Sequence, residues 1–359
     1  MKLFLHIGTE KTGSSYLQSL LAINRAQLES ASIYFPKAGK REKDMRSGKI
    51  SPGNGQDLYE GLSAQKYDVV KKILLEHFLT ADKKDLEKVL ISNELLVKTF
   101  AEEEVLTSFV HTARAIGYNK IKLLLIIRDP VDQALSLYKH RAKSGNVAPI
   151  SEWIKNDYAY GNVLGSFFNI INKINTIDTE YRKYSSGSGS LESILFKDWL
   201  EIETPVKVLD KKVNPSLTLS ELLMLRNLNL YNPDLVPLLY DKLLKIPKSL
   251  KAGESGLEGY YRSIISENLE NYHEVWEECN KRLADGEYIE IPDSIEENAG
   301  SDINEKYVMT FSNDQIAAIN SFIMDCLSFK INLKLIKIKV RKRLGQLKRT
   351  LTNILGIKR

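Results

Sequence analysis

The feature that most constrains the fold is a short, continuous apolar run from Ile121 to Ile127, in a chain of 359 residues. Its centre reads Lys-Leu-Leu-Leu-Ile-Ile, without the strict alternation of polar and apolar residues that a half-exposed strand shows. Such a run suits a parallel strand that is buried on both faces by helices. It predicts the central strand of an α/β domain, followed by a helix from Val131 to Lys143.

Elements of the same kind precede this strand. We expect strands at Lys2–Ile7, Ser32–Phe35 and Val89–Ser92, and a helix at Ser14–Glu29. Strands that alternate with helices indicate a doubly wound parallel sheet flanked by helices. From Ser151 onward helical patterns dominate, so the fold class is α/β with a helical second half.

Three segments depart from this pattern. Residues 36–65 are rich in Gly, Ser, Lys and Pro, which predicts a long loop over one end of the sheet that serves as a lid. Ser185–Ser190 consists only of Ser and Gly and predicts a flexible surface loop. We therefore expect one α/β domain over residues 1–330 and a separate tail over residues 331–359.

The positive charge of the chain belongs to this tail. The net charge is +5, but eleven of the 51 basic residues lie between Lys330 and Arg359, a segment without Asp or Glu. The rest of the chain has 40 basic and 46 acidic residues, a net charge of −6. A nucleic-acid partner is therefore not expected for the body of the protein.

A helix over residues 332–355 would be amphipathic. Its apolar residues recur at spacings of three or four: Leu333, Ile336, Val340, Leu344, Leu347, Leu351 and Ile354. Lys and Arg would flank this face, as in helices that lie on an anionic membrane surface. A helix that packs on the acidic body, or on another chain, is the alternative.

The remaining composition favours a cytoplasmic location. The two cysteines, Cys279 and Cys326, have no metal-ligand or redox spacing, so a reducing compartment is the simpler assumption. Met1–Gly8 is too short for a secretory signal, and no run approaches the roughly 18 apolar residues of a membrane span. We expect a cytoplasmic protein that the tail can hold at the cytoplasmic membrane face.

The first functional motif is Gly8-Thr9-Glu10-Lys11-Thr12-Gly13-Ser14-Ser15, where the first strand turns into the first helix. A glycine-containing loop that opens a helix directs backbone N–H groups and the positive end of the helix dipole at an anion. The two glycines have the separation of a nucleotide P-loop, G-x-x-x-x-G-K-[ST], so the fold is P-loop-like. However, Ser14 stands at the lysine position, and the positive charge lies earlier, at Lys11. A tight turn with Ser14 or Ser15 as the helix N-cap is the structural alternative.

The second motif is Arg128-Asp129-Pro130 at the end of the central strand, with Ser136 eight residues after Arg128. The carboxyl end of a parallel strand places Arg128 in the crevice where doubly wound proteins bind ligands. Pro130 suits the first turn of a helix, which would hold Ser136 on a defined face. A guanidinium and a hydroxyl form a suitable clamp for a phosphate monoester. The alternative is that Arg128 pairs with Asp129 or Asp132 at the surface.

Together these motifs resemble those of sulfotransferases that use 3′-phosphoadenosine-5′-phosphosulfate (PAPS). Lys11-Thr12-Gly13-Ser14-Ser15 is similar to their 5′-phosphosulfate loop, K-[ST]-G-[ST]-[ST], and Arg128 with Ser136 to their 3′-phosphate motif. The stretch His6–Gln18 resembles most closely bacterial members that act on glycans or other envelope molecules, which often have histidine where this chain has Glu10. A weaker similarity covers Val213–Leu217 through Leu225–Asn229.

The resemblance implies a PAPS donor, no metal, and sulfuryl transfer to a hydroxyl of a glycan or lipid-linked acceptor. Lys11 would bind the leaving oxygen, Thr12 to Ser15 the 5′-phosphate, and Arg128 with Ser136 the 3′-phosphate. Glu94, just after the strand Val89–Ser92, is the first candidate for the general base, and a helix-start carboxylate is its structural alternative.

Other candidate bases and other functions stay open. Glu10 is the second candidate base, weakened by the adjacent Lys11. His6 is expected in the first strand beneath the loop, and little weight falls on the remaining histidines, His77, His111, His140 and His273. The alternative functions are a phosphoryl-transferring P-loop enzyme, which would need Lys after Gly13 and an acidic magnesium ligand, and a non-catalytic binding protein with a sulfotransferase-like fold.

Overall fold

The structure is a computed structural model. In it the chain forms two compact units. The described residues are 1–49, 51–185, 190–203, 206–208, 217–253, 255–291, 309–327, 338, 339 and 342. Unit 1 consists of Met1–Tyr138, Pro149–Asn214 and Tyr261–Ile303, and unit 2 of Lys139–Ala148, Pro215–Tyr260 and Asn304–Arg359. This division is not evident in the sequence, where residues 1–330 read as one domain.

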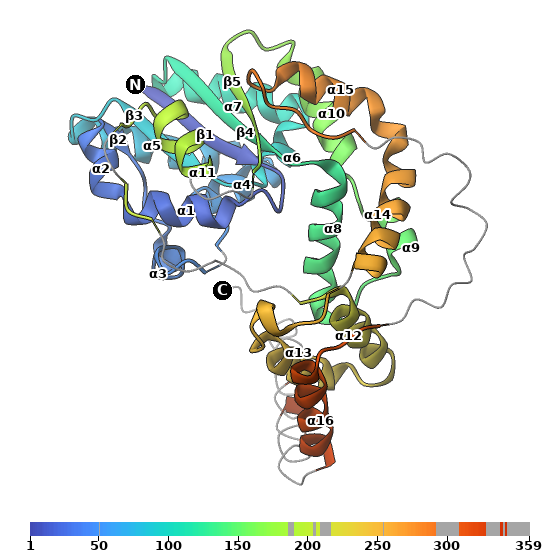
Figure 1. Cartoon of the computed structure of the whole chain (residues 1–359). Coiled ribbons are helices and arrows are strands. Elements are labelled where there is room, and N and C mark those ends of the chain that lie inside the picture. The colour runs from blue at the N-terminus through green and yellow to red at the C-terminus, as the bar shows by residue number, and fades with distance from the viewer. Residues whose placement is uncertain are drawn as a thin grey trace, which may run out of the picture. The chain divides into compact units, whose positions relative to one another are not determined.

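Unit 1 is built on a five-stranded sheet of order β2-β3-β1-β4-β5 in which all the pairings are parallel. The strands are β1 (Lys2–Gly8), β2 (Ile33–Tyr34), β3 (Lys88–Ser92), β4 (Lys120–Ile127) and β5 (Ile177–Lys183) (Figure 1). The α/β class with a parallel sheet flanked by helices is therefore confirmed. The sequence pattern missed β5, whose residues are mostly polar and only partly buried.

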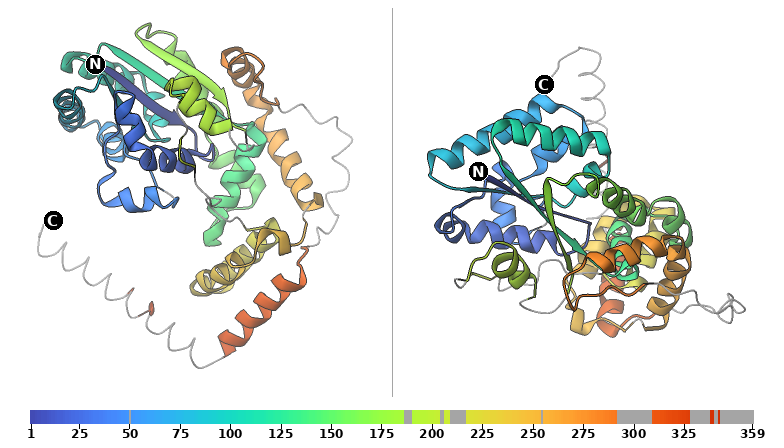
Figure 2. Two further views of the ribbon diagram at one scale, coloured as in Figure 1. Left: turned by 60° about the vertical axis from the view of Figure 1, so that its left-hand side comes forward. Right: turned by 90° about the horizontal axis from the view of Figure 1, so that it is seen from above.

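Helices cover both faces of the sheet, as the view from above in Figure 2 shows. Between β1 and β5 the chain forms α1 (Ser14–Ile23), α2 (Arg25–Ser30), α3 (Glu42–Arg46), α4 (Gln56–Ser63), α5 (Tyr67–Lys83), α6 (Leu96–Phe100), α7 (Glu103–Ile116), α8 (Pro130–Arg141), α9 (Ile150–Asn156) and α10 (Tyr160–Ile171). After β5, unit 1 contains α11 (Ser190–Glu192), the π-helical segment η3 (Ser193–Trp199), the part of α14 (Ser255–Leu269) from Tyr261 onward, and α15 (His273–Arg282). The helix predicted at Ser14–Glu29 is divided between α1 and α2 at Asn24.

Residues 36–65, predicted as one long loop, contain the short helices η1 (Gly39–Arg41) and α3, and then α4. The part between α3 and α4 is fixed to the end of β3, because the Ser92 amide donates to Asn54 Oδ1 at 2.7 Å and the Gly55 amide to the Ser92 carbonyl at 3.2 Å. The sequence does not indicate these contacts with β3, since the partners are distant along the chain.

Ser185–Ser190, predicted as a flexible surface loop, lies largely outside the described residues.

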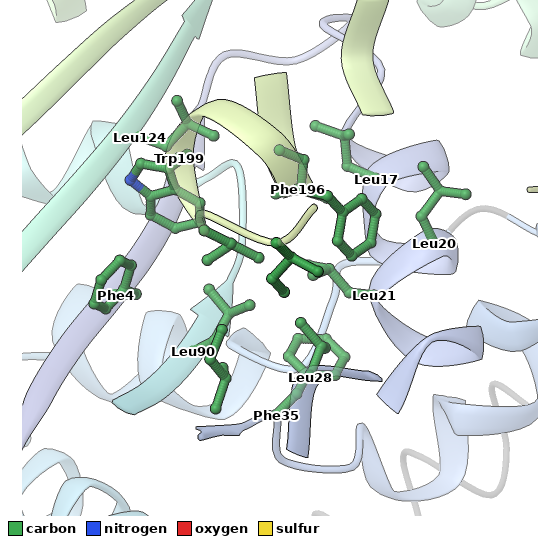
Figure 3. Close-up of a cluster of buried hydrophobic side chains, with 14 of the residues drawn as sticks. Phe4, Leu17, Leu20, Leu21, Leu28, Phe35, Leu90, Leu124, Phe196 and Trp199 are labelled. Carbon is green, nitrogen blue, oxygen red and sulfur yellow. The ribbon is translucent and has the colours of Figure 1, made fainter. Parts of the chain in front are cut away.

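One core cluster fixes α1 against the sheet (Figure 3). Phe4, Leu90 and Leu124 of three neighbouring strands meet Leu17, Leu20 and Leu21 of α1, Leu28, Phe35, and Phe196 and Trp199 of η3. Phe4 and Trp199 pack edge to face, with ring centroids 5.3 Å apart. Fully burying each such side chain contributes roughly 1.5–3 kcal/mol, so the start of α1 is held firmly at the carboxyl edge of the sheet.

Unit 2 contains α12 (Leu219–Tyr231), α13 (Val236–Leu244) and α16 (Asn313–Leu327). A buried ion pair joins its segments: Lys251 Nζ lies 2.8 Å from Glu221 Oε2, with 4% and 0% of the side chains exposed. Gln315 of α16 donates to the other oxygen of Glu221 at 2.9 Å. None of the helices in the described part of the chain combines the length and hydrophobicity that a membrane crossing needs.

Candidate functional site at the carboxyl edge of the sheet

The two sequence motifs follow neighbouring strands of the sheet. The connection after β1 leads toward β2, whereas the connection after β4 leads toward β5 at the opposite edge. Strands β1 and β4 are paired in parallel from Lys2 with Lys120 to Gly8 with Ile126, so both end at the same edge. This is the topological switch point, where open α/β sheets bind their ligands.

The loop after β1 is a tight turn with two left-handed residues. Lys11 has φ 72° and Gly13 has φ 80°. The Thr12 hydroxyl donates to the Thr9 carbonyl at 2.7 Å and closes the turn. A left-handed conformation costs a residue with a side chain about 1–2 kcal/mol, and strain of this kind is characteristic of functional sites.

Gly13 cannot carry a side chain without displacing its neighbours. A Cβ atom there would lie 2.8 Å from Leu191 Cδ1 and 3.1 Å from the ring of Tyr184. The amides of Tyr16 and Leu17 both donate to the Gly13 carbonyl. The amides of Ser14 and Ser15 therefore lie in the first turn of α1, where the helix itself offers no acceptor to N–H groups. These N–H groups and the helix dipole favour an anion at this point.

Arg128 joins the two motifs into one site. Its Nη1 donates to the carbonyl of Lys11 at 3.1 Å, and its guanidinium lies over the ring of Tyr184, 5.0 Å from the centroid. Gln133 of α8 makes a second connection, because its Nε2 donates to the carbonyl of Glu10 at 2.9 Å. The loop after β1 and the start of α8 are therefore held together by hydrogen bonds.

The Arg128 side chain extends along α8 toward Ser136. Its Nη2 lies 4.0 Å from Oδ2 of Asp132, which is one helical turn before the half-buried Ser136 and on the same face. Arg262 of α14 also donates to the Asp132 carboxylate. Asp132 therefore stands between two arginines, and an anion that binds Arg128 would compete with it.

Glu94 lies at the end of β3, close to the first turns of α1. Gln18 Nε2 donates to its Oε2 at 3.1 Å. Burial raises the pKa of Glu94, and the negative charge of Glu10 adds to the rise, while the nearby Gln18 and Ser14 side chains oppose it. The Ser14 hydroxyl lies near this carboxylate but outside hydrogen-bond geometry, so Ser14 Oγ is a buried atom without a partner among the described residues. A carboxylate with a raised pKa is a stronger base.

The other acidic candidate, Glu10, is engaged differently. Its Oε2 lies 3.1 Å from Nζ of Lys98 on α6, so this carboxylate is engaged in an ion pair. His6 is fully buried in β1 beneath the loop, with Nδ1 2.8 Å from the Ser92 hydroxyl. His77 packs against Tyr34 at β2, and the other three histidines are on helices.

Most of the predicted site residues come together at this edge: Lys11, Thr12, Gly13, Ser14, Ser15, Glu94 and Arg128. Ser136 lies on α8 one helical turn after Asp132, the residue that the Arg128 guanidinium approaches. Sequence reasoning missed Gln18, Gln133, Tyr184 and Arg262. Gln18 is the one that a local pattern could have indicated, since it follows Ser14 at the i+4 spacing that shares a helix face.

The described residues bring together no three His, Cys, Asp or Glu side chains in a way that suits a metal ion. Val213–Ser216, part of the weaker sequence similarity, lies outside the described residues. No family model, no curated protein and no solved structure matches this chain.

Proposed function

We propose that the protein is a P-loop-like sulfotransferase that transfers a sulfuryl group from PAPS to an acceptor hydroxyl. The observation that carries the proposal is the hydrogen bond from Arg128 to the carbonyl of Lys11 at the switch point. It joins a loop with the composition of a 5′-phosphosulfate motif to an arginine and serine with the spacing of a 3′-phosphate motif. A donor with phosphates at both positions matches two anion sites held this close together.

In this proposal each residue has a separate task. The acceptor oxygen attacks sulfur, the bond from sulfur to the 5′-phosphate oxygen breaks, and 3′,5′-bisphosphoadenosine leaves with the electron pair. Lys11 neutralises the charge on that oxygen, and the amides and hydroxyls of Thr12 to Ser15 hold the phosphate. The acceptor proton passes to Glu94, which the raised pKa and the contacts with α1 favour over Glu10.

Arg128 and Ser136 would select the donor by its 3′-phosphate. The guanidinium is already extended along α8 to within 4.0 Å of Asp132, one turn from Ser136. A dianionic phosphate attracts Arg128 more strongly than the single charge of Asp132 and can bond bidentately. Tyr184, which lies over the same guanidinium, restricts its orientation.

For the acceptor we propose a hydroxyl of a glycan or lipid-linked envelope molecule, on the strength of the sequence resemblance. The amphipathic segment 332–355, which lies outside the described residues except at 338, 339 and 342, would bring the protein to an anionic membrane surface. Lys342 lies 2.9 Å from Asp234, but its side chain is 68% exposed. Exposed pairs contribute about 0–1 kcal/mol, so this pair by itself adds little to the position of the segment. Deleting residues 332–359 should abolish binding to anionic vesicles and preserve transfer to soluble acceptors.

Transfer of labelled sulfate from PAPS to envelope extracts tests the proposed activity. Lys11→Ala should lower the rate roughly a hundredfold, as for loss of a group that stabilises a developing charge. The matched control is Lys71→Ala on α5, where the lysine is exposed and distant along the chain. Near-normal turnover in Lys11→Ala would contradict the role of this lysine.

Ligand binding tests the specificity for the donor. Arg128→Ala and Ser136→Ala should weaken 3′,5′-bisphosphoadenosine far more than adenosine 5′-phosphosulfate, because only the former has the 3′-phosphate. Equal weakening of both ligands would mean that the two residues only support the fold. A strict magnesium requirement would favour phosphoryl transfer, and binding of PAPS without turnover on any acceptor would favour a non-catalytic protein.

A further inference from the structure

Gln18 is a buried polar residue that none of the phosphate-binding tasks requires. It lies on α1, four residues after Ser14, and its side chain is completely buried. Its Nε2 donates to Oε2 of Glu94 at 3.1 Å, so it connects the helix that follows the anion loop to the candidate base on the neighbouring strand end.

Gly53 packs closely against the amide of Gln18. Gly53 has φ 79°, and a Cβ atom there would lie 2.1 Å from the Ser92 carbonyl oxygen and 2.8 Å from Gln18 Nε2. Any residue other than glycine would therefore clash at this position, because its Cβ would overlap the backbone of β3. The segment Ser51–Gly55 therefore packs directly against the Gln18 side chain and limits its movement.

Core packing does not explain the choice of an amide at this position. Gln18 Oε1 is buried and has no partner among the described residues, and an unpaired buried polar atom costs about 1–3 kcal/mol. Methionine or leucine would fill a similar volume without this cost. The amide therefore has a use that offsets this cost, and among the described residues its hydrogen-bond partner is Glu94.

The groups that face Glu94 make this hydrogen bond decisive for the carboxylate. Ser14 and Gln18 approach from α1, and Glu10 adds negative charge from the loop, its own carboxylate being paired with Lys98 of α6. Gln18 supplies the one side-chain hydrogen bond of good geometry from this set. Without it, the Glu94 carboxylate would keep its interaction with the backbone amide of Glu94 but would be held less tightly about its side-chain torsions.

We propose that Gln18 is a positioning residue that holds the Glu94 carboxylate in the orientation required to accept the acceptor proton. The Ser51–Gly55 segment keeps Gln18 in place, so part of the region predicted as a lid acts instead as a fixed support of the base. The inference rests on the proposed function for its chemical consequence, while the hydrogen bond itself can be tested without turnover.

The first test measures the protonation of Glu94 directly. In full-length protein labelled with ¹³C at the glutamate carboxyl carbons, Glu94→Gln assigns the resonance of Glu94. Because Gln18 donates to the charged form, Gln18→Met should raise the pKa of Glu94 further, and the matched Gln27→Met on α2 should leave it unchanged. Gln18→Asn, which keeps the amide but shortens its reach, should act like Gln18→Met and guards against a folding defect of the latter. An unchanged titration in both Gln18 variants would overturn the proposal.

The second test uses labelled-sulfate transfer. Gln18→Met should lower kcat roughly tenfold at little change in KM for the donor, and should move the acidic limb of the pH–rate profile upward. A fall in kcat without this displacement would indicate a merely structural role and refute the positioning role. If the carboxyl titration responds as expected but no variant and no wild-type protein transfers sulfate, the proposed function fails while the contact stands.

Discussion

The buried His6 should make unit 1 sensitive to acid. Burial lowers its pKa from 6.5 to about 4, because the charged imidazolium would lose its hydration. The unfolded chain therefore binds a proton near pH 6.5 that the folded chain binds only near pH 4. One pKa unit corresponds to 1.36 kcal/mol, so this group alone should lower the free energy of unfolding by about 3 kcal/mol as the pH falls through that window.

Urea unfolding at several pH values between 7 and 4 measures this effect. The three tryptophans, Trp153, Trp199 and Trp276, all belong to unit 1, so their fluorescence follows the unit that contains His6. His6→Asn removes the titration and retains an amide that can reach toward Ser92. The stability advantage of the wild type over His6→Asn should shrink by about 3 kcal/mol between pH 7 and pH 4. An advantage that is constant with pH would refute the reasoning.

Two further predictions concern residues of the candidate site. Glu94→Gln should raise the melting temperature at pH 8, because burial raises the pKa of Glu94 and so disfavours the charged form in the folded protein. The gain should disappear as the pH falls through that raised pKa. Calorimetry at pH 8 and at acidic pH measures it, and an equal gain at the two pH values would contradict the prediction. Gly13→Ala should lower the free energy of unfolding in urea by about 1–3 kcal/mol, because the alanine would have to adopt φ 80° and its Cβ would lie 2.8 Å from Leu191 Cδ1. A loss no larger than that of an alanine substitution at the exposed Gly253, which has open space for a Cβ, would contradict this geometry.

The local elements of the site could be predicted because each has a local cause. The apolar run before Arg128 is typical of a parallel strand buried on both faces, and it forms β4. Pro130 starts a helix almost immediately afterwards. Gly13 allows the left-handed turn that begins α1. Proximity of Lys11 and Arg128 also followed from the sequence, once both were assigned to the carboxyl ends of parallel strands.

Pairings between distant segments could not be predicted in this way. The sequence of β5, Ile-Asp-Thr-Glu-Tyr-Arg-Lys, has few apolar residues, and it forms a strand because its backbone pairs with β4. Its charged side chains lie beside opposite charges there: Lys120 with Asp178 at 3.0 Å, Lys122 with Glu180 at 3.5 Å and Arg182 with Glu287 at 2.8 Å. Likewise, Gln18 meets Glu94 only because the core fixes α1 beside the end of β3. The sequence by itself determined the apolar strands and the turn that begins α1, since those depend on neighbours along the chain. Tertiary structure decided which polar residue orients the candidate base, because a buried hydrogen bond depends on what packing brings to within 3.1 Å.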